Sequence, residues 1–353
     1  MPTYRTGPVV RVLSERPGFQ RVLVRIDGVD QRAYNLTQLT GDVALGDDVV
    51  CNTTAVGLGL GTGGWHVVHW NLSRRRADVP GAGHIMKLRY SSLQVDTGAA
   101  EEQMPDEPVG LAGLPVVLCS LHSQVAIAAA AFAVAAPGRR LAYVMTDGAA
   151  LPLALSELVD QLRVRALLAG TVTGGHAFGG DYEAVNVISA LVVARARLRA
   201  DAVIVGMGPG VVGTGSPLGH TAIELAGIAD TTLRLGGRPI FALRASEADQ
   251  RDRHLGLSHH TSTVLGLCRG ATLAVPVGDE TLAGIALIEG HARVSVAVPD
   301  VAAMLDRVGL VVTTMGRGPG DDPLFFRFAA AAGLVAAHLV GPRTAAPDSE
   351  GAG

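Results

Sequence analysis

The sequence predicts an α/β protein in which a mostly parallel, Rossmann-like sheet has helices on both faces and a small N-terminal β-barrel or sandwich precedes it. From Leu114 onward, short apolar runs alternate with helical segments, as in repeated βα units. The mean hydropathy is +0.32 and aromatic residues make up only 4%, which suits aliphatic strands buried on both faces. Residues 8–72 instead contain short alternating strands without helical periodicity.

The composition excludes several classes of protein. The formal net charge is −3 and the arginines are dispersed, so the sequence predicts neither a nucleic-acid partner nor a membrane surface. Lys87 is the only lysine, which leaves one candidate for lysine chemistry. Three widely spaced cysteines without C-x-x-C spacing predict reduced thiols and a cytoplasmic protein. The longest apolar run, residues 115–136, is interrupted by polar residues 122–124, which argues against a membrane span.

Four segments are expected along the chain. They are a small β domain over residues 1–73, a linker or surface excursion over 74–110, an α/β domain with the site over 111–343, and a frayed tail over 344–353. Within the excursion, the segment GHIMKLRYSSLQ could dock on the α/β domain. Docking would bring Lys87 and Arg89 close to a site.

The α/β domain is expected to contain its strands and helices in alternation. The predicted strands are residues 115–119, 140–145, 166–169, 202–205, 239–243, 272–276, 291–298 and 310–314. Helices are expected after residue 124, over 155–165 and 187–199, from about 221, over 300–308 and after 322. Neighbouring parallel strands should then carry Val116, Val203, Phe241 and Val311.

Polar residues follow the ends of successive predicted strands. Because parallel strands end at one edge of the sheet, these residues are expected to share a ligand site where the strand order reverses. The candidates for proton transfer are His176, Asp147, Asp181, His122 and His220. Two arginines, Arg244 and Arg317, are expected to pair with negative charge on a substrate.

The loop after residues 202–205 is rich in glycine and reads GMGPGVVGTGSPLG. It matches G-x-G-x-x-G, but it is not in the first βα unit and no acidic residue ends the next strand, which argues against a dinucleotide site. No lysine follows, so it is not a P-loop. We expect instead a nest of N–H groups for phosphate or carboxylate. Its members are Gly206, Gly208, Gly210, Gly213, Thr214, Gly215 and Ser216.

A divalent metal site is a second interpretation of these loops. The candidate ligands are His259, His260 and Glu183, although adjacent residues rarely share one ion. Neither H-E-x-x-H nor H-x-H spacing occurs. If a metal is bound, at least three of the loop histidines and carboxylates should converge. The sequence assigns no cofactor.

Six motifs resemble a bacterial family known only as domain-of-unknown-function family 3866. They are HSQ, MTDGAALP, GHAFGGDYEAVN, GMGPGVVGTGSPLG, LSHHT and TMGRGPGDDPLFF. The resemblance covers nearly the whole chain. It implies a soluble bacterial protein and assigns no catalytic role, because the family has no established activity.

The residues themselves favour an enzyme that acts on a small anionic substrate, such as a phosphorylated one. His and Asp acid–base chemistry at the C-terminal edge of the sheet would carry the reaction. One alternative is a non-catalytic small-molecule-binding or regulatory module of the same fold. Another is a divalent-metal-dependent hydrolase. The expected partner is a small anionic molecule, and a homo-oligomer stays open.

Overall fold

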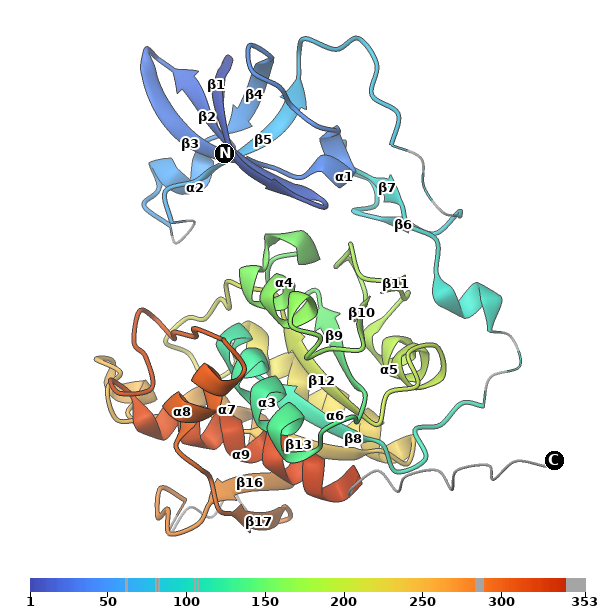
Figure 1. Cartoon of the computed structure of the whole chain (residues 1–353), viewed down its shortest axis with the longest axis vertical. Coiled ribbons are helices and arrows are strands. Elements are labelled where there is room, and N and C mark those ends of the chain that lie inside the picture. The colour runs from blue at the N-terminus through green and yellow to red at the C-terminus, as the bar shows by residue number, and fades with distance from the viewer. Residues whose placement is uncertain are drawn as a thin grey trace, which may run out of the picture.

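A computed structural model of the chain describes residues 1–60, 63–79, 81, 83–104, 106, 108–282 and 289–340. A small barrel lies at one end of a larger α/β unit, and the described residues between 74 and 110 run along the side between them (Figure 1). The tail expected from residue 344 lies outside the described residues.

The N-terminal unit is a closed barrel of five strands in the order β1-β2-β3-β5-β4. The strands are β1 (Tyr4–Arg16), β2 (Phe19–Ile26), β3 (Val29–Asn35), β4 (Asp48–Asn52) and β5 (His66–Asn71), with short helices α1 (Thr37–Thr40) and α2 (Thr54–Gly57). Alternate side chains such as Val22 and Val24 point inward and are fully buried. The predicted small β unit is therefore confirmed, and it is a barrel.

The α/β unit is built on eight parallel strands in the order β11-β10-β9-β12-β8-β13-β16-β17. They are β8 (Pro115–Cys119), β9 (Leu141–Thr146), β10 (Gly170–Thr173), β11 (Tyr182–Glu183), β12 (Ala202–Met207), β13 (Arg238–Ala242), β16 (Thr272–Pro276) and β17 (Ala292–Val296). In β8, Val117 and Cys119 belong to one apolar core, whereas Val116 and Leu118 belong to the other. This confirms the predicted sheet with two buried faces.

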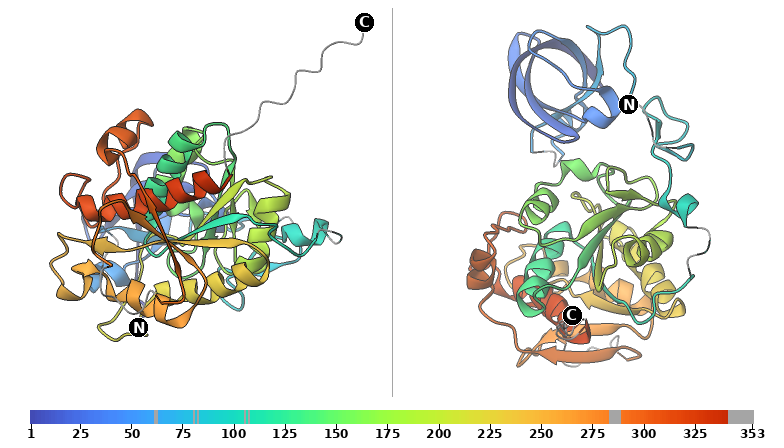
Figure 2. Two further views of the ribbon diagram at one scale, coloured as in Figure 1. Left: turned by 90° about the horizontal axis from the view of Figure 1, so that it is seen from below. Right: turned by 45° about the vertical axis from the view of Figure 1, so that its right-hand side comes forward.

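Helices cover both faces of the sheet (Figure 2). One face carries α3 (His122–Ala135), α4 (Glu157–Val164), α8 (Val301–Arg307) and α9 (Pro323–Val340), and the other carries α5 (Val187–Ala196), α6 (Glu224–Arg234) and α7 (His259–Leu267). Among the described residues, α9 is the helix long and apolar enough to cross a membrane. Because 67% of α9 is buried inside the protein, it is a core helix.

Helices α3 and α9 pack closely at a glycine. A Cβ on Gly333 would lie 2.1 Å from the carbonyl oxygen of Ala128. We expect Gly333→Ala to lower the free energy of unfolding by about 1–3 kcal/mol, because the helices must separate. As a control, Gly227→Ala in α6 adds a Cβ that meets nothing within 4 Å, and it should stabilise by about 0.4–1 kcal/mol. Urea unfolding measures both changes, and a neutral Gly333→Ala would contradict the close packing.

The strand predicted at residues 310–314 is wrong. These residues form no sheet strand in the structure. Leu310 and Val312 are buried in the core beside α8 and α9, whereas Val311 is 79% exposed. The alternation of buried and exposed side chains along residues 310–314 therefore arises because this segment packs against helices, without a strand partner. The other three predicted positions do lie on the neighbouring strands β12, β8 and β13.

The strand order reverses at the centre of the sheet. The chain leaves β9 toward β10 on one side, whereas it leaves β12, the neighbour of β9, toward β13 on the other side. In open α/β sheets ligands bind where such connections diverge, beyond the carboxyl ends of the strands. The loops after β9, β12 and β13 are therefore the place to look for a site.

Candidate functional site

The excursion contacts the α/β unit at Lys87, which is the docking that the sequence left open. Its ammonium group donates to the carbonyl oxygens of Thr173 (3.0 Å) and Ala177 (2.5 Å) and to Oε2 of Glu183 (2.7 Å). The side chain is 2% exposed, and burial lowers its pKa while the Glu183 carboxylate opposes this shift. All three ammonium hydrogens are used, so Lys87 anchors the excursion and is not a free amine.

His176 and Asp147 lie together beside this anchor. Nδ1 of His176 accepts a hydrogen bond from the backbone N–H of Leu88 (3.1 Å), and Arg89 Nη2 lies 3.4 Å from its Nε2. Asp147 accepts from the backbone N–H of His176 (2.9 Å). The carboxylate thus positions the loop at His176, and the structure shows no hydrogen bond between this carboxylate and the imidazole.

The two other predicted carboxylates stabilise the loop around His176. Asp181 accepts from the backbone N–H (2.8 Å) and hydroxyl (2.9 Å) of Thr171 and pairs with Arg163. Glu183 accepts from Lys87, from the Thr173 hydroxyl (2.6 Å) and from the Gly179 N–H. In the described part of the chain, neither carboxylate is hydrogen-bonded to a histidine. Among the described residues, Glu183 therefore has no hydrogen bond to His259 or His260.

His122 links three elements. Its Nδ1 donates to the carbonyl oxygen of Met207 (3.1 Å), and its Nε2 accepts from the Ser156 hydroxyl (2.6 Å). Ser156 accepts from the backbone N–H of Val159, so its own hydrogen is available for the imidazole, which assigns this tautomer. Burial lowers the pKa of His122 to about 4. With both nitrogens bonded, His122 ties the start of α3 to β12 and to the start of α4.

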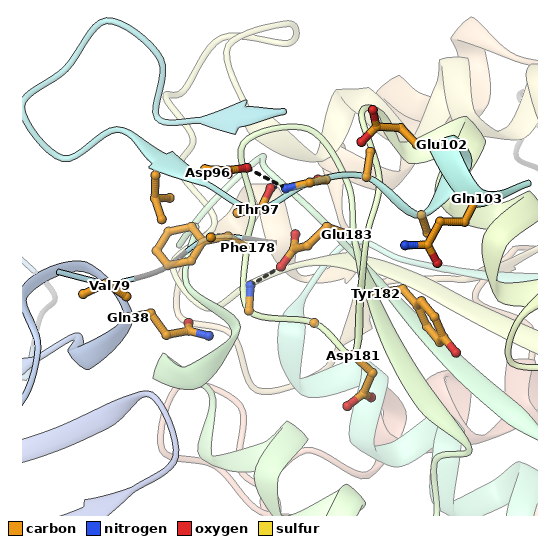
Figure 3. Close-up of a pocket in the computed structure, with 17 residues that line it drawn as sticks. Gln38, Val79, Asp96, Thr97, Glu102, Gln103, Phe178, Asp181, Tyr182 and Glu183 are labelled. Carbon is orange, nitrogen blue, oxygen red and sulfur yellow. Dashed lines mark hydrogen bonds between the residues drawn. The ribbon is translucent and has the colours of Figure 1, made fainter. Parts of the chain in front are cut away.

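A cavity of about 550 Å³ lies between the excursion and β11 (Figure 3). Gln38 of the barrel and Phe178 line it together with four acidic side chains, those of Asp96, Glu102, Asp181 and Glu183. Its charged lining side chains are all acidic. Such a cavity repels a small anion, so the expected anion site must lie elsewhere.

The glycine-rich loop follows β12 and is closed on itself. The hydroxyls of Thr214 and Ser216 are 2.8 Å apart, and they bond to the carbonyl and N–H groups of Gly219. Gly210 has a φ of +98° in open space, which a residue with a side chain rarely adopts. The hydroxyls predicted as anion donors are thus used within the loop.

The other glycines of the loop have different surroundings. Gly206 lies within β12 against Cys119, and Gly208 faces the carbonyl oxygen of Ala150. Nothing lies within 4 Å of a Cβ added to Gly215. A Cβ on Gly213 would lie 2.9 Å from Nε2 of His260. Gly213 is therefore the glycine of this loop that lies against a histidine side chain at the sheet edge.

Four imidazoles meet beside Gly213, and we call His220, His254, His259 and His260 the histidine cluster. His220 follows β12, His254 ends the short helix η4 (Asp252–His254), and the other two begin α7. The ring centroids of His220 and His260 are 4.0 Å apart and stacked. The centroid of His259 lies 4.4 Å from that of His260, and the centroid of His254 lies 4.9 Å from each of these two. His220 thus joins a cluster with three histidines that follow it 34 to 40 residues later in the chain.

The cluster is neutral near neutral pH. Burial lowers the pKa of all four imidazoles, to about 3 for His254 and His260. Both ring nitrogens of His220 and Nε2 of His259 are buried without a hydrogen-bond partner among the described residues. The Pro217 carbonyl lies close enough to His220 to oppose the lowering of its pKa. The carbonyl and the imidazole nitrogens do not, however, have the geometry of a hydrogen bond. Because an unpaired buried polar atom costs about 1–3 kcal/mol, these nitrogens indicate a ligand.

An arginine–aspartate network adjoins the cluster. Asp249 pairs with Arg251 (2.8 Å), Arg244 (3.5 Å) and Arg317 (3.7 Å), and Asp322 pairs with Arg317 (3.2 Å). These three positive and two negative side chains leave an excess of one positive charge. Burial, followed by the charge of Arg251, lowers the pKa of Arg244 to about 10. The network therefore favours the approach of an anion.

Arg244 connects the network to the histidine cluster. It follows β13, is only 5% exposed, and its Nη1 lies 3.3 Å from Nδ1 of His260. A guanidinium can only donate, so Nδ1 of His260 is the acceptor and the proton of the neutral ring is on Nε2. That Nε2 faces Gly213, so it is available as a hydrogen-bond donor beneath the glycine loop.

Glu224 is a site residue that the sequence analysis does not identify. It begins α6, where an acidic residue is an ordinary feature of a first helical turn. Its Oε1 accepts from the Thr146 hydroxyl (2.5 Å) at the end of β9. Burial, and to a smaller extent the charge of Asp147, raises its pKa to about 7. A carboxyl group with this pKa, at the carboxyl end of β9, can act as a general acid or base.

The raised pKa of Glu224 predicts a pH dependence of stability. The folded pKa of about 7 exceeds the ordinary 4.5, so the stabilisation is present below pH 4.5 and is lost as the pH rises through 7. We expect Glu224→Gln to remove this loss, which is up to about 1.4 kcal/mol per pH unit between these values. Urea unfolding at pH 5 to 8 measures the difference from wild type. For the exposed control Glu280→Gln, the difference in unfolding free energy from wild type should not depend on pH. If the difference for Glu224→Gln were also independent of pH, the pKa of Glu224 would not be raised.

The predicted residues fall into two groups along one sheet edge. His220, Arg244, His259, His260 and Arg317 surround the histidine cluster, where His254, Asp249 and Arg251 join them. The residues His122, His176, Asp147, Asp181 and Glu183 lie on the side of β9 to β11. The structure thus gathers the cationic residues with four histidines and keeps most of the predicted carboxylates apart from them.

The comparison with known families covers this whole region. The model of a family described as "Protein of unknown function (DUF3866)" matches residues 32–333, from β3 to α9. No curated protein matches the chain. The description assigns no role to any residue of the site.

Proposed function

Because the chain belongs to this family of unknown function, we propose from the site alone that it is an enzyme acting on a small anionic substrate. The substrate lies between Arg244, the histidine cluster and Gly213. One observation supports this most: the buried Arg244 guanidinium, in a network with one excess positive charge, contacts His260, and the His260 ring packs against His220 and His259, whose buried nitrogens lack partners among the described residues. A carboxylate or phosphate oxygen satisfies both kinds of group.

The proposed roles follow from the hydrogen bonds. Arg244 and Arg317 bind the negative charge, and Nε2 of His260 donates a hydrogen bond to it. A bound anion raises the pKa of the neighbouring imidazoles, so His220, with two unpaired nitrogens, accepts a proton in the complex. Glu224, at the start of the helix that follows His220, is the second acid–base group. His176 and Asp147 stay candidates on the neighbouring side of the edge.

We also propose a cytoplasmic location and a small molecule as the partner. Cys51, Cys119 and Cys268 are buried and unpaired, as expected for reduced thiols. The function makes no use of nucleic acid or a membrane.

A thermal-shift screen tests the proposed function. Inorganic phosphate, sugar phosphates, nucleotides and dicarboxylates are added to the purified protein. A ligand at a hundred times its dissociation constant should add about 2.7 kcal/mol of stability. Ligands that bind are then assayed for turnover, which separates an enzyme from a binding module. Flat responses to every anion would remove the basis of the proposal.

Two glycines of the loop provide a matched pair of variants. Gly213→Ala places a methyl group 2.9 Å from Nε2 of His260, whereas Gly215→Ala meets nothing within 4 Å, and neither glycine has a positive φ. We expect Gly213→Ala to weaken binding of the screened anion by about 10-fold or more, because the methyl group obstructs a donor worth about 1.5–3 kcal/mol to a charged group. Calorimetry on both folded variants measures this. Equal affinities in the two variants would place the anion away from Gly213.

A further inference from the structure

The geometry of the histidine cluster resembles that of a metal site. One ring nitrogen each of His254, His259 and His260 can be chosen so that all three lie within 4.8 Å of one another. Imidazoles bound to one zinc ion at about 2.0–2.1 Å have centroids about 5 Å apart. The centroids of these three rings are 4.4 to 4.9 Å apart. The three rings therefore have about the spacing of ligands around a single ion, and their nitrogens, which lie within 4.8 Å of one another, move closer together when they bind it.

The nitrogens available for an ion are identified by their neighbours. Nδ1 of His254 lies 2.7 Å from the Ser258 hydroxyl, which leaves Nε2 for the ion. Ligating histidines usually have their other nitrogen bonded in this way. Nε2 of His259 is buried and has no hydrogen-bond partner among the described residues. His220 stacks on His260 with both nitrogens unpaired and is the nearest further imidazole.

The third imidazole is shared with Arg244. If the ion takes Nδ1 of His260, that nitrogen has no lone pair left for the guanidinium. If the ion takes Nε2, the proton moves to Nδ1, which then cannot accept a hydrogen bond. In either case Arg244 Nη1 loses its hydrogen-bond acceptor, Nδ1 of His260, which lies 3.3 Å away. A buried guanidinium then requires another acceptor, and an anion supplies one.

We propose that His254, His259 and His260 bind a divalent transition-metal ion and that this ion releases Arg244 to bind the anionic substrate. Imidazole ligands suit zinc, cobalt, nickel, copper and iron. Three protein ligands leave a coordination position open for a substrate oxygen or a water molecule. His220 stacks on His260 and is therefore next to this site. Of the ligands predicted from the sequence, His259 and His260 belong to this site, whereas Glu183 is bonded to Lys87.

The metal half of this inference is independent, whereas the release of Arg244 rests on the proposed function. The first experiment titrates Co²⁺ into tag-free protein freed of metal, with calorimetry and visible absorption as readouts. Wild type should bind one Co²⁺ with the absorption of a nitrogen-ligated ion. Loss of an outer-shell partner typically costs about 10–100-fold in metal affinity, and His259→Ala removes a ligand itself, so its loss should be at least that large.

Variants and controls keep this test decisive. His254 is buried, so His254→Gln, of similar size, accompanies His259→Ala, and thermal unfolding confirms that both are folded. His338→Ala at an exposed position of α9 should bind Co²⁺ as wild type does. Absence of Co²⁺ and Zn²⁺ binding in wild type, or unchanged binding in both cluster variants, would overturn the metal site.

The second experiment titrates inorganic phosphate with and without Co²⁺. Release of Arg244 predicts tighter phosphate binding in the presence of Co²⁺, by about 5-fold or more, and an equal effect of phosphate on Co²⁺ affinity. Equal phosphate affinity in both conditions would refute the coupling. Phosphate binding without Co²⁺ binding would refute the metal site and leave the proposed function. Co²⁺ binding in a protein that binds no anion would support the metal site and refute the proposed function.

Discussion

Lys87→Ala is expected to lower the free energy of unfolding by about 3–5 kcal/mol. The substitution leaves the Glu183 carboxylate, 14% exposed, without its cation, and it removes the donor to two backbone carbonyls. Breaking a buried ion pair by removing one partner typically costs this much, because the remaining charge stays desolvated. Urea unfolding with two probes measures the loss and checks that the transition stays two-state.

The double variant Lys87→Ala with Glu183→Ala is the informative control for this ion pair. It should be less destabilised than the sum of the two single variants, because no unpaired charge remains. Arg89→Ala changes an exposed neighbour of the same segment and should alter stability by no more than about 0.5 kcal/mol. A loss of less than 1 kcal/mol for Lys87→Ala would mean that the excursion is not anchored at this residue.

Arg244→Lys is expected to weaken binding of inorganic phosphate at least about 30-fold. The ammonium group keeps the charge but lacks the planar set of donors that contacts His260 and Asp249 at once. Truncating a buried charged partner costs about 2–5 kcal/mol of binding free energy, and 2 kcal/mol corresponds to about 30-fold. Calorimetric titration of the two proteins at pH 7 measures the ratio.

Arg253→Lys is the matched control for Arg244. Its charge lowers the pKa of His259, but its side chain is exposed. Its replacement should change phosphate affinity by less than about 3-fold, since exposed charges contribute about 0–1 kcal/mol. If Arg244→Lys bound phosphate as wild type does, the buried guanidinium would not be an anion-binding group.

Most strands of the sheet were predictable because their signal is local, although β10 (Gly170–Thr173) begins just after the predicted residues 166–169 and β11 (Tyr182–Glu183) was not predicted. The run Ala202 to Val205 is apolar at every position, as a strand buried on both faces requires, and it forms most of β12. Residues 310–314 show why a local signal can also mislead. Leu310 and Val312 alternate with exposed residues as in a strand, but helices bury them instead of a neighbouring strand.

The site was predictable only in part, because it depends on contacts between distant segments. The loops after the strands were correctly expected at one edge, since parallel strands impose it. Which loops come together could not be predicted. His220 stacks on His260 forty residues later, and nothing in either motif specifies that contact. Glu224 carries no signal at all, because its raised pKa comes from burial against Thr146 in the folded protein.

The most direct test of the central claim is the position of a bound anion in a crystal soaked in tungstate, whose anomalous scattering identifies it. We predict tungstate oxygens at hydrogen-bond distance, about 3 Å, from the guanidinium of Arg244 and from His260, beneath Gly213. Tungstate that is ordered only elsewhere, for example at the exposed Arg74 to Arg76, would contradict an anion site at the histidine cluster.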